Sequence, residues 1–463
     1  MKSKATILMM MAACICLMML PSVFAIKVMV PPSTEQSMPN GLKVIVVENH
    51  EQPVVSMRLL IKTGTAFDPA NKAGLASMTA NLLDQGTATR DANEIAKEID
   101  FMGGSLDASS DLDATYATCE VLTKHFDTGL KLLSDIILNP TFPQEEIDRV
   151  RKRTIGGLMR AKDDPNQVVA QQYRLALFGS HPYAQPGNGT VESVGGITKD
   201  DITGFWQKYY IPNNSVLFVV GDVKPADIMA KVGTAFSSWK QGTPPEMNFP
   251  EAPQVKGMKI ILINKPDATQ SNVKIGHLGI NRYNPDIYAC RVMNYVLGGG
   301  GFVSRMMADI RAKRGLTYDI NSQFAYQRFT GDFTVTTFTR TDSTAKAVQA
   351  AIEQLQKIRQ SDVTPEELSE TVSFYSGFFP RQFETPQQVA NQMSTVELYG
   401  LGKNYLPDYI DNIAKVTAKD VRAAAQKYIH PDDLLIVVVG KADAIRESLK
   451  KIAPVTEVEL SDL

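Results

Sequence analysis

The sequence predicts an α+β protein built from two similar halves, each with helices packed on one face of a mainly antiparallel sheet. Two observations support this fold class. A segment near the middle of the chain is repeated near its end, and each half combines strand-like runs with long amphipathic segments that do not strictly alternate. With 463 residues, the chain has room for more than one domain.

The repeat aligns without gaps. Residues 197–221 read ITKDDITGFWQKYYIPNNSVLFVVG, and residues 416–440 read VTAKDVRAAAQKYIHPDDLLIVVVG, with nine identities in 25 positions at an offset of 219. Residues 41–47 and 257–263 also match, as GLKVIVV and GMKIILI, at an offset of 216. Nearly equal offsets at both ends indicate one unit of about 215 residues that is present twice.

Each unit is expected to begin with a β-rich run and to end with a helix, a turn and a strand. In the first unit, residues 93–102 and 126–138 have the apolar spacing of amphipathic helices. Residues 116–122 alternate between apolar and polar, which is typical of a strand. Strands and helices are therefore both expected within one unit.

A proline-rich segment separates the two units. Residues 242–257 carry four prolines, which disfavour a helix and stiffen the chain. We therefore predict an N-terminal domain at 26–241, a linker at 242–257 and a C-terminal domain at 258–463.

The N-terminus has the pattern of a secretory signal peptide. Two lysines precede an almost unbroken apolar run over residues 5–20, and Val23-Phe24-Ala25 places small residues at positions −3 and −1 of a cleavage site. We predict a signal peptide at 1–25 and an exported, periplasmic chain. The alternative is a retained membrane anchor, but the apolar run is short for a spanning helix.

Composition excludes several classes of function. Lys and Arg number 48 against 50 Asp and Glu, so the net charge of −2 provides no basic field for nucleic acid. The chain has no G-x-S-x-G, no G-x-x-x-x-G-K-[ST] and no C-x-x-C motif. The five histidines lie far apart, and none has a partner at i+3 or i+4. Each is therefore interpreted as a hydrogen-bonded structural residue, not as a metal ligand.

Several motifs spread over nearly the whole chain resemble those of one family. They are GTAFDPANKAGLA from residue 64, NPTFP from residue 139, FGSHPYAQPGNGT from residue 178, YIPNN followed by VVGDV from residue 210, and KRGLTY from residue 313. Each motif is weak alone. As a set they resemble the pitrilysin/insulinase family of zinc peptidases, which includes the mitochondrial processing peptidase and core subunits of a respiratory complex.

The segment 74–87 departs from the pattern of active family members. Those members read roughly GLAHFLEHMLFKGT, in which two His one helical turn apart bind zinc and the Glu between them is the general base. This chain reads GLASMTANLLDQGT, so Ser77 and Asn81 stand at the His positions and Ala80 at the Glu position. The family's third ligand, a Glu, falls near Gly157. The resemblance thus implies no zinc in this chain and no hydrolysis by it alone.

The second half retains a different feature of the family. An Arg and a Tyr seven residues apart follow a Gly-rich turn in family members, and they match Arg311 and Tyr318. By resemblance they hold the substrate backbone, because a guanidinium and a phenol can donate to carbonyl oxygens and stabilise developing negative charge. The alternative is a helix-surface Arg and a packed Tyr. Arg305 and Arg314 are interpreted as helix-surface charges.

Loss of the zinc residues together with an Arg/Tyr pair implies a catalytically silent subunit of a heteromeric zinc peptidase. The expected partner is a homologous chain that carries His-x-x-Glu-His and the zinc, and the two would close like a clamshell around a peptide substrate. Peptidase activity is then expected only with that partner. The alternative is a purely structural or peptide-binding protein of the same fold. We expect no nucleic-acid partner and no stable membrane anchor.

Overall fold

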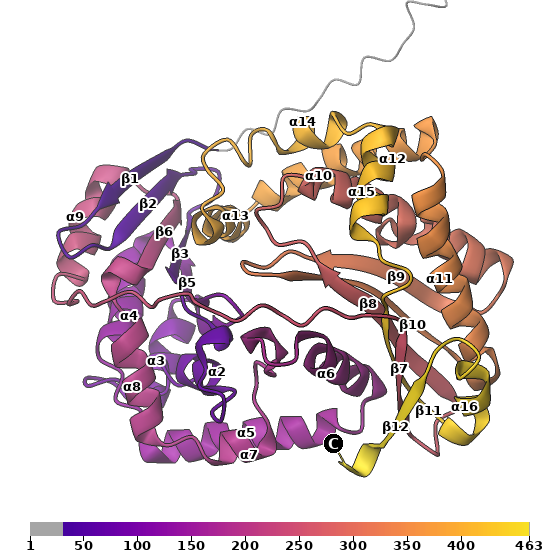
Figure 1. Cartoon of the computed structure of the whole chain (residues 1–463). Coiled ribbons are helices and arrows are strands. Elements are labelled where there is room, and N and C mark those ends of the chain that lie inside the picture. Colours follow the sequence, from indigo (N-terminus) through magenta and orange to yellow (C-terminus); the bar gives the residue numbers. More distant parts are fainter. Residues whose placement is uncertain (1–30, 463) are drawn as a thin grey trace, which may run out of the picture.

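The computed structural model describes residues 31–462, so the predicted signal peptide at 1–25 lies outside the described residues. Two six-stranded sheets form the left and right parts of the molecule, each with helices packed against it (Figure 1). The first half of the chain forms one sheet and the second half forms the other. The α+β class with two similar units is therefore confirmed.

The first sheet has the strand order β1-β2-β6-β3-β5-β4. Strands β2 and β6 are parallel, and every other neighbouring pair is antiparallel. The strands are β1 (Ser33–Ser37), β2 (Lys43–Glu48), β3 (Val54–Ile61), β4 (Ser105–Ser110), β5 (Thr115–Leu122) and β6 (Ser215–Gly221). Strand β5 contains the strand expected at 116–122.

The second sheet has the order β12-β7-β11-β8-β10-β9 and repeats five strands of the first with the same pair orientations. The sixth strand differs, because β1 is antiparallel to β2 whereas β12 is parallel to β7. The strands are β7 (Lys259–Asn264), β8 (Gln270–Gly279), β9 (Thr317–Ala325), β10 (Gly331–Arg340), β11 (Leu435–Gly440) and β12 (Val455–Glu459). The duplication seen in the sequence is therefore a duplication of topology.

The helices expected at 93–102 and 126–138 are present as α3 and α4. Helices of the first half are α2 (Leu75–Ala80), α3 (Ala92–Phe101), α4 (Phe126–Leu138), α5 (Gln144–Ala161), α6 (Pro165–Phe178), α7 (Val191–Gly195), α8 (Lys199–Tyr209) and α9 (Pro225–Ala235). Helices of the second half are α10 (Ile287–Asn294), α11 (Thr344–Gln360), α12 (Pro365–Phe378), α13 (Pro386–Tyr399), α14 (Tyr409–Ala414), α15 (Ala418–Tyr428) and α16 (Ala442–Leu449). Within residues 31–462, none of the helices has the length and apolar character needed to cross a membrane.

The two copies of the repeat start their helices in the same way. Thr198 precedes α8 and Thr417 precedes α15, and each hydroxyl accepts the backbone N–H of an Asp three residues later. The Asp carboxylate accepts the Thr backbone N–H in return. This reciprocal cap satisfies two N–H groups that a helix start leaves unpaired. The repeat therefore preserves a helix start as well as the apolar spacing.

Strand β6 is buried on both faces, but its own half covers only one of them. Leu217 and Val219 belong to the core formed with the first half's own helices. Val216, Phe218 and Val220 belong to a separate core on the opposite face. Helix α13, from the second half of the chain, packs against that opposite face.

Strand β11 shows the reciprocal arrangement. Ile436 and Val438 face the core of the second half, whereas Val437 and Val439 pack in a core with α6 of the first half. Figure 1 shows α6 beside the second sheet and α13 beside the first. The two halves therefore exchange one helix each. The sequence predicted helices on one face of each sheet. This holds for the helices of the same half, but the exchanged helix covers the other face as well.

Close packing at the exchange explains one glycine. Tyr173 of α6 is buried, and its hydroxyl donates to the carbonyl oxygen of Phe333 at 3.2 Å. A Cβ atom on Gly276 of β8 would lie 2.4 Å from that hydroxyl and 2.0 Å from the same carbonyl oxygen. Any larger residue at 276 would push α6 away from the second sheet.

The connector between α9 and β7 crosses the molecule without a helix or strand (Figure 1). Phe249 on this connector packs edge-on against Phe67 of the first half, with ring centroids 5.3 Å apart, and against Phe329 of the second half at 4.6 Å. The connector thus contacts both halves. The domain boundaries at 241 and 258 remain predictions.

One buried carboxylate joins the ends of both exchanged helices. Asp113, in the turn between β4 and β5, accepts hydrogen bonds from the hydroxyls of Tyr183 at 2.5 Å and Tyr399 at 3.0 Å, and from the backbone N–H of Arg328 at 3.2 Å. Tyr183 follows α6, and Tyr399 ends α13. Burial raises the pKa of both tyrosines, and the Asp113 charge raises it further, so both hydroxyls stay protonated and donate.

The exchange of helices predicts that neither half folds alone. A fragment of residues 26–241 would expose the face of β6 that α13 covers, and a fragment of residues 242–463 would expose the face of β11 that α6 covers. We expect each fragment to aggregate, and the two expressed together to recover a single cooperative unfolding transition by circular dichroism. Cooperative unfolding of either fragment by itself would contradict this dependence.

The Asp113 contacts predict a large stability loss on truncation. Asp113→Ala leaves the buried hydroxyl of Tyr183 and the half-buried hydroxyl of Tyr399 without this acceptor and should lower the free energy of unfolding by about 2–5 kcal/mol. Urea denaturation measures the change. The control is Asp107→Ala, which removes an exposed carboxylate from β4 and should change the stability by less than about 0.5 kcal/mol. Equal effects of the two substitutions would show that Asp113 does not join the halves.

Candidate functional site

The degenerate zinc motif lies on the short helix α2, whose start depends on a buried carboxylate. Asp68 accepts the backbone N–H groups of Gly74 and Ala76, each at 2.8 Å. Burial raises the pKa of Asp68 to about 7, although these backbone donors act in the opposite direction. Gly74 has a φ of +93°, a conformation that favours glycine. Asp68 and Gly74 both belong to the motif that begins at residue 64, and together they fix the start of α2.

Ser77, Ala80 and Asn81 lie on α2 and at its C-terminal end. Ser77 is buried, and its hydroxyl donates to the carbonyl oxygen of Gly187 at 2.7 Å. Ala80 is fully buried, and Asn81 is half-buried. A hydroxyl, a methyl group and an amide provide neither the imidazole ligands nor the carboxylate base of a zinc peptidase. The donor set at these positions therefore does not fit zinc.

Gly157, at the position of the third ligand, lies on α5 and borders the same region. It lines a cavity of about 710 Å³, which Gly187 also lines. Ser77 of α2 is linked to this wall by its hydrogen bond to the Gly187 carbonyl oxygen, although the residues of α2 do not themselves line the cavity. A Cβ atom on Gly157 would meet no other atom within 4 Å. The space that a ligand side chain from α5 would enter is open.

Within residues 31–462, no group of three or more His, Cys, Asp or Glu side chains is arranged to hold a metal ion. Two buried histidines make structural hydrogen bonds. His181 Nδ1 accepts the backbone N–H of Tyr183 at 3.0 Å, and His277 Nε2 accepts that of His430 at 3.1 Å. Burial lowers the pKa of His277 to about 4, so its ring stays neutral and can accept. Both residues have the structural role expected from the sequence.

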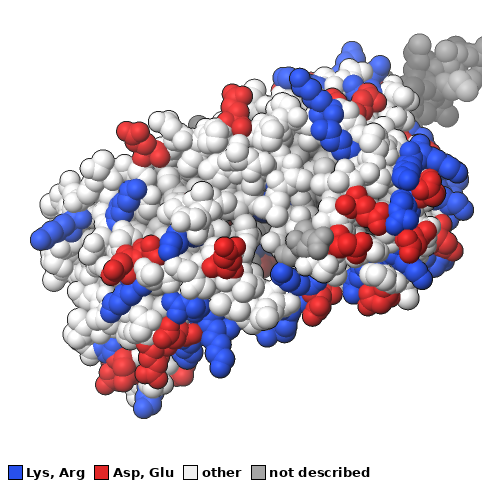
Figure 2. Space-filling model, turned by 60° about the horizontal axis from the view of Figure 1, so that its bottom comes forward, with Lys and Arg blue, Asp and Glu red and all other residues white. Residues whose placement is uncertain are grey.

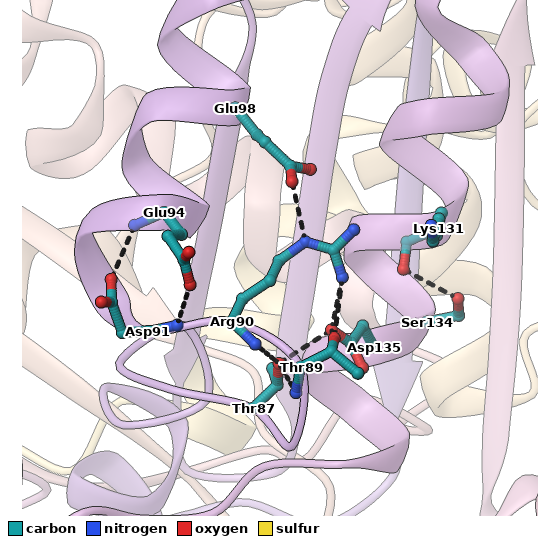
Figure 3. A network of polar contacts seen from close by, with 9 residues as sticks. All are labelled: Thr87, Thr89, Arg90, Asp91, Glu94, Glu98, Lys131, Ser134 and Asp135. Carbon is teal, nitrogen blue, oxygen red and sulfur yellow. Dashed lines mark hydrogen bonds and ion pairs between the residues drawn. The ribbon is translucent and has the colours of Figure 1, made fainter.

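The loop after α2 is held by the carboxylate of Asp135 (Figure 3). Thr87, the last residue of the degenerate motif, and Thr89 donate from their hydroxyls to Asp135 Oδ2 at 2.8 and 2.9 Å. Arg90 donates to the same oxygen at 2.7 Å and to Glu98 at 3.0 Å. Burial raises the pKa of Asp135, but its hydrogen bonds outweigh burial and leave the pKa below its usual value. The end of the motif is therefore fixed by structural contacts.

In the second half, Arg311 and Tyr318 lie against each other. The guanidinium carbon of Arg311 is 4.8 Å from the ring centroid of Tyr318 and 4.6 Å from that of Phe302. Tyr318 is 72% exposed and Phe302 is 73% exposed. A cation therefore lies against two exposed aromatic rings, at distances typical of cation–π contacts. The structure brings together the two residues that the family resemblance paired.

The neighbouring arginines differ from Arg311 in their partners. Arg305 donates to both carboxylate oxygens of Glu367, at 2.6 and 2.7 Å, and Arg314 forms ion pairs with two acidic residues at 2.7 and 2.8 Å. In the part of the chain that the structure describes, Arg311 has no carboxylate partner. Arg305 and Arg314 are surface charges, as predicted. The substrate role of Arg311 and Tyr318 stays a prediction.

Unusual backbone surrounds this pair. Residues Tyr295–Gly299 and Met307–Lys313 are π-helical, with i to i+5 hydrogen bonds such as that from the Arg314 N–H to the Asp309 carbonyl at 2.9 Å. Such turns are rare and occur frequently at functional sites. Phe302, between the two turns, is not among the predicted site residues. An aromatic residue directly after a glycine run is the sequence signal that could have identified it.

The surface charge does not form a field of one sign. On the face shown in Figure 2, Lys and Arg residues are interspersed with Asp and Glu residues and separated by broad uncharged areas. This distribution agrees with the net charge of −2. It offers no continuous basic surface for a nucleic-acid backbone on this face.

Comparisons with known proteins match both halves. Residues 43–190 match the model of the insulinase family (peptidase family M16), and residues 196–374 match that of the peptidase M16 inactive domain. A Rickettsia felis protein named an uncharacterized zinc protease is 27% identical over 416 residues, which cover 89% of this chain and 93% of that protein. The non-peptidase homolog YmxG of Helicobacter pylori is 25% identical over 398 residues, covering 86% and 91%.

Solved structures share the fold over nearly the whole chain. The crystal structure of a peptidase M16 inactive domain from Pseudomonas fluorescens has a TM-score of 0.83 at 27% identity and covers 88% of this chain and 98% of that one. A protease structure from Helicobacter pylori has a TM-score of 0.83 at 21% identity, with coverage of 89% and 100%. The chain therefore belongs to the insulinase family of peptidases, family M16.

Proposed function

We propose that this chain is a catalytically silent subunit of a heteromeric zinc peptidase. It supplies Arg311 and Tyr318 to the bound peptide, and a homologous partner supplies the zinc and the general base through a His-x-x-Glu-His motif. The proposal includes export to the periplasm through the signal peptide at 1–25. The observation that carries it is the contrast between residues without ligand or base groups on α2 and α5 and the contact of Arg311, which has no carboxylate partner among residues 31–462, with the exposed ring of Tyr318.

The chemistry of the first half supports catalytic silence. Ser77 uses its hydroxyl in a buried hydrogen bond, and Ala80 has no group that can accept a proton from water. Gly157 provides no carboxylate. Neither the nucleophilic water nor the metal that would activate it can be held by these residues.

The geometry of the second half supports a role in binding peptide. The guanidinium of Arg311 lies against the rings of Phe302 and Tyr318 and has no carboxylate partner among the described residues, so its N–H groups can donate to a carbonyl oxygen. Such donors stabilise negative charge strongly only where water is excluded. Because both rings are more than two-thirds exposed, this chain does not itself exclude water there. A facing subunit that covers the pair would complete the site.

The second candidate is a purely structural or peptide-binding protein of the same fold, with no role in proteolysis. The name of the Helicobacter pylori relative, a non-peptidase homolog, favours it. The two candidates differ in what Arg311 and Tyr318 do once a zinc-bearing partner is present.

The residues at the zinc position predict that the purified chain holds no stoichiometric zinc. Elemental analysis after dialysis against zinc-containing buffer should find far less than one zinc per chain, and the chain alone should not cleave unstructured peptides. One zinc per chain, removed by a chelator together with peptidase activity, would contradict catalytic silence.

With a zinc-bearing partner, Arg311→Ala and Tyr318→Phe should lower kcat/KM for peptide cleavage. We expect about a 10- to 100-fold loss, equivalent to about 1.4–2.8 kcal/mol of transition-state stabilisation. Assembly of the two chains, measured by size-exclusion chromatography, should be unchanged.

The matched control is Lys313→Ala, which removes an exposed cation two residues from Arg311. It should leave both cleavage and assembly unchanged. Normal cleavage by a pair that lacks both Arg311 and the Tyr318 hydroxyl would favour the structural alternative.

A further inference from the structure

The cavity beside the replaced zinc site has walls from both halves of the chain. Helices α5 and α6 and the loop at 186–189 line it from the first half, and Lys274 of β8 and Asp332 of β10 line it from the second. Its volume of about 710 Å³ lies within the range of about 300–1,000 Å³ that is typical of ligand-binding pockets. The cavity is therefore large enough for more than a single ion.

The lining is strongly basic. Arg153 and Arg160 on α5, Arg174 on α6 and Lys274 on β8 provide four positive side chains, against the single carboxylate of Asp332. The chain as a whole has a net charge of −2, so this excess of positive charge is local. Clustered cations repel one another, and a bound anion relieves that repulsion.

None of these four cations forms an ion pair with a described residue. Arg174 donates to the backbone carbonyl of Tyr183 at 3.3 Å, and the Lys274 ammonium lies 5.2 Å from the ring centroid of Tyr173. By contrast, Arg305, Arg314 and Arg446 on other surfaces all have carboxylates within 3 Å. These cations therefore have no directly bonded carboxylate, and Asp84 and Asp332 act on Arg153, Arg174 and Lys274 only at longer range.

The remaining carboxylate does not neutralise them. Burial raises the pKa of Asp332, although Lys274 and Arg174 act in the opposite direction. Burial also lowers the pKa of Lys274; Asp332 acts in the opposite direction, and the nearby Arg174 lowers the pKa further. Both shifts indicate charges that lack full solvation or pairing, which a second anion next to Lys274 and Arg174 would supply.

We propose that this cavity binds the oxyanion of a carboxylate- or phosphate-bearing ligand, held by Arg153, Arg174 and Lys274 beside the position where active relatives of this fold would hold a metal. Tyr173, Leu158 and Phe178 add apolar surface to the lining, which can contact an organic body attached to the anion. The assignment concerns α5, α6 and β8 and holds whether or not a zinc-bearing partner binds elsewhere on the chain.

Gly157 provides a sharp test because its side-chain position faces open space. Gly157→Glu would place a carboxylate at the wall of the cavity, where it would compete with a bound anion for the same cations. Gly204→Glu is the matched control, since Gly204 also lies within a helix, α8, and also has no atom within 4 Å of its Cβ position. Lys274→Gln removes one cation without adding charge.

The experiment is isothermal titration calorimetry of the full chain at low ionic strength with tetraglutamate, tetraglutamine, citrate and inorganic phosphate. We expect at least one of the three anions to bind, more weakly as salt is added, and tetraglutamine not to bind. Gly157→Glu and Lys274→Gln should each weaken binding at least tenfold, and Gly204→Glu should not. Thermal unfolding of each variant establishes that it is folded.

The pattern of binding identifies the source of the anion. Binding of tetraglutamate alone assigns the site to an acidic peptide, whereas binding of citrate or phosphate assigns it to a free small anion. Failure of all three anions to bind would overturn the proposal. So would equal binding by tetraglutamine, or unchanged binding by folded Gly157→Glu.

Discussion

The structure depends on the exchange of α6 and α13 between the two halves. A central strand buried on both faces needs apolar cover on both, and in each half the chain's own helices supply only one layer. The other layer comes from the partner half, and the carboxylate of Asp113 links Tyr183 at the end of one exchanged helix to Tyr399 at the end of the other. Burial of apolar area is the dominant favourable term in folding, so we expect the two halves to unfold as one cooperative unit.

The same exchange determines where a site can form. Helix α6 covers β11 with one face and lines the basic cavity with Arg174, so the region of the replaced zinc site is shaped by both halves. Arg311, in contrast, lies on a π-helical turn and contacts the exposed rings of Phe302 and Tyr318. One site is a cavity within the fold, and the other is a surface that needs a facing molecule.

The central strands of both sheets can be predicted from the sequence. The repeated runs VLFVVG and LIVVVG predict strands, and their lack of alternation agrees with burial on both faces. They do not say which helix covers the second face, because an amphipathic segment shows that it has an apolar side without identifying its partner. The exchange of α6 and α13 therefore became visible only in three dimensions.

Some residues of the candidate sites can be proposed from the sequence, and others cannot. Ser77, Ala80 and Asn81 could be assigned because they occupy one short motif, and Arg311 and Tyr318 because their spacing matches a family pattern. The basic cavity could not, since its cations come from two helices and a strand that are distant in sequence. Nothing in a linear pattern marks a lysine on a strand as the neighbour of an arginine on a helix from the other half.

If Arg311 and Tyr318 bind substrate, the surface around Arg311 contacts peptide when a zinc-bearing partner is present. Site-specific photocrosslinking tests it most directly, with p-benzoylphenylalanine in place of the exposed Phe302, whose ring lies against Arg311. We expect a crosslink from residue 302 to a labelled peptide in the presence of the partner. Excess unlabelled peptide should abolish this crosslink. Crosslinks to the partner chain alone, with none to the peptide, would contradict it.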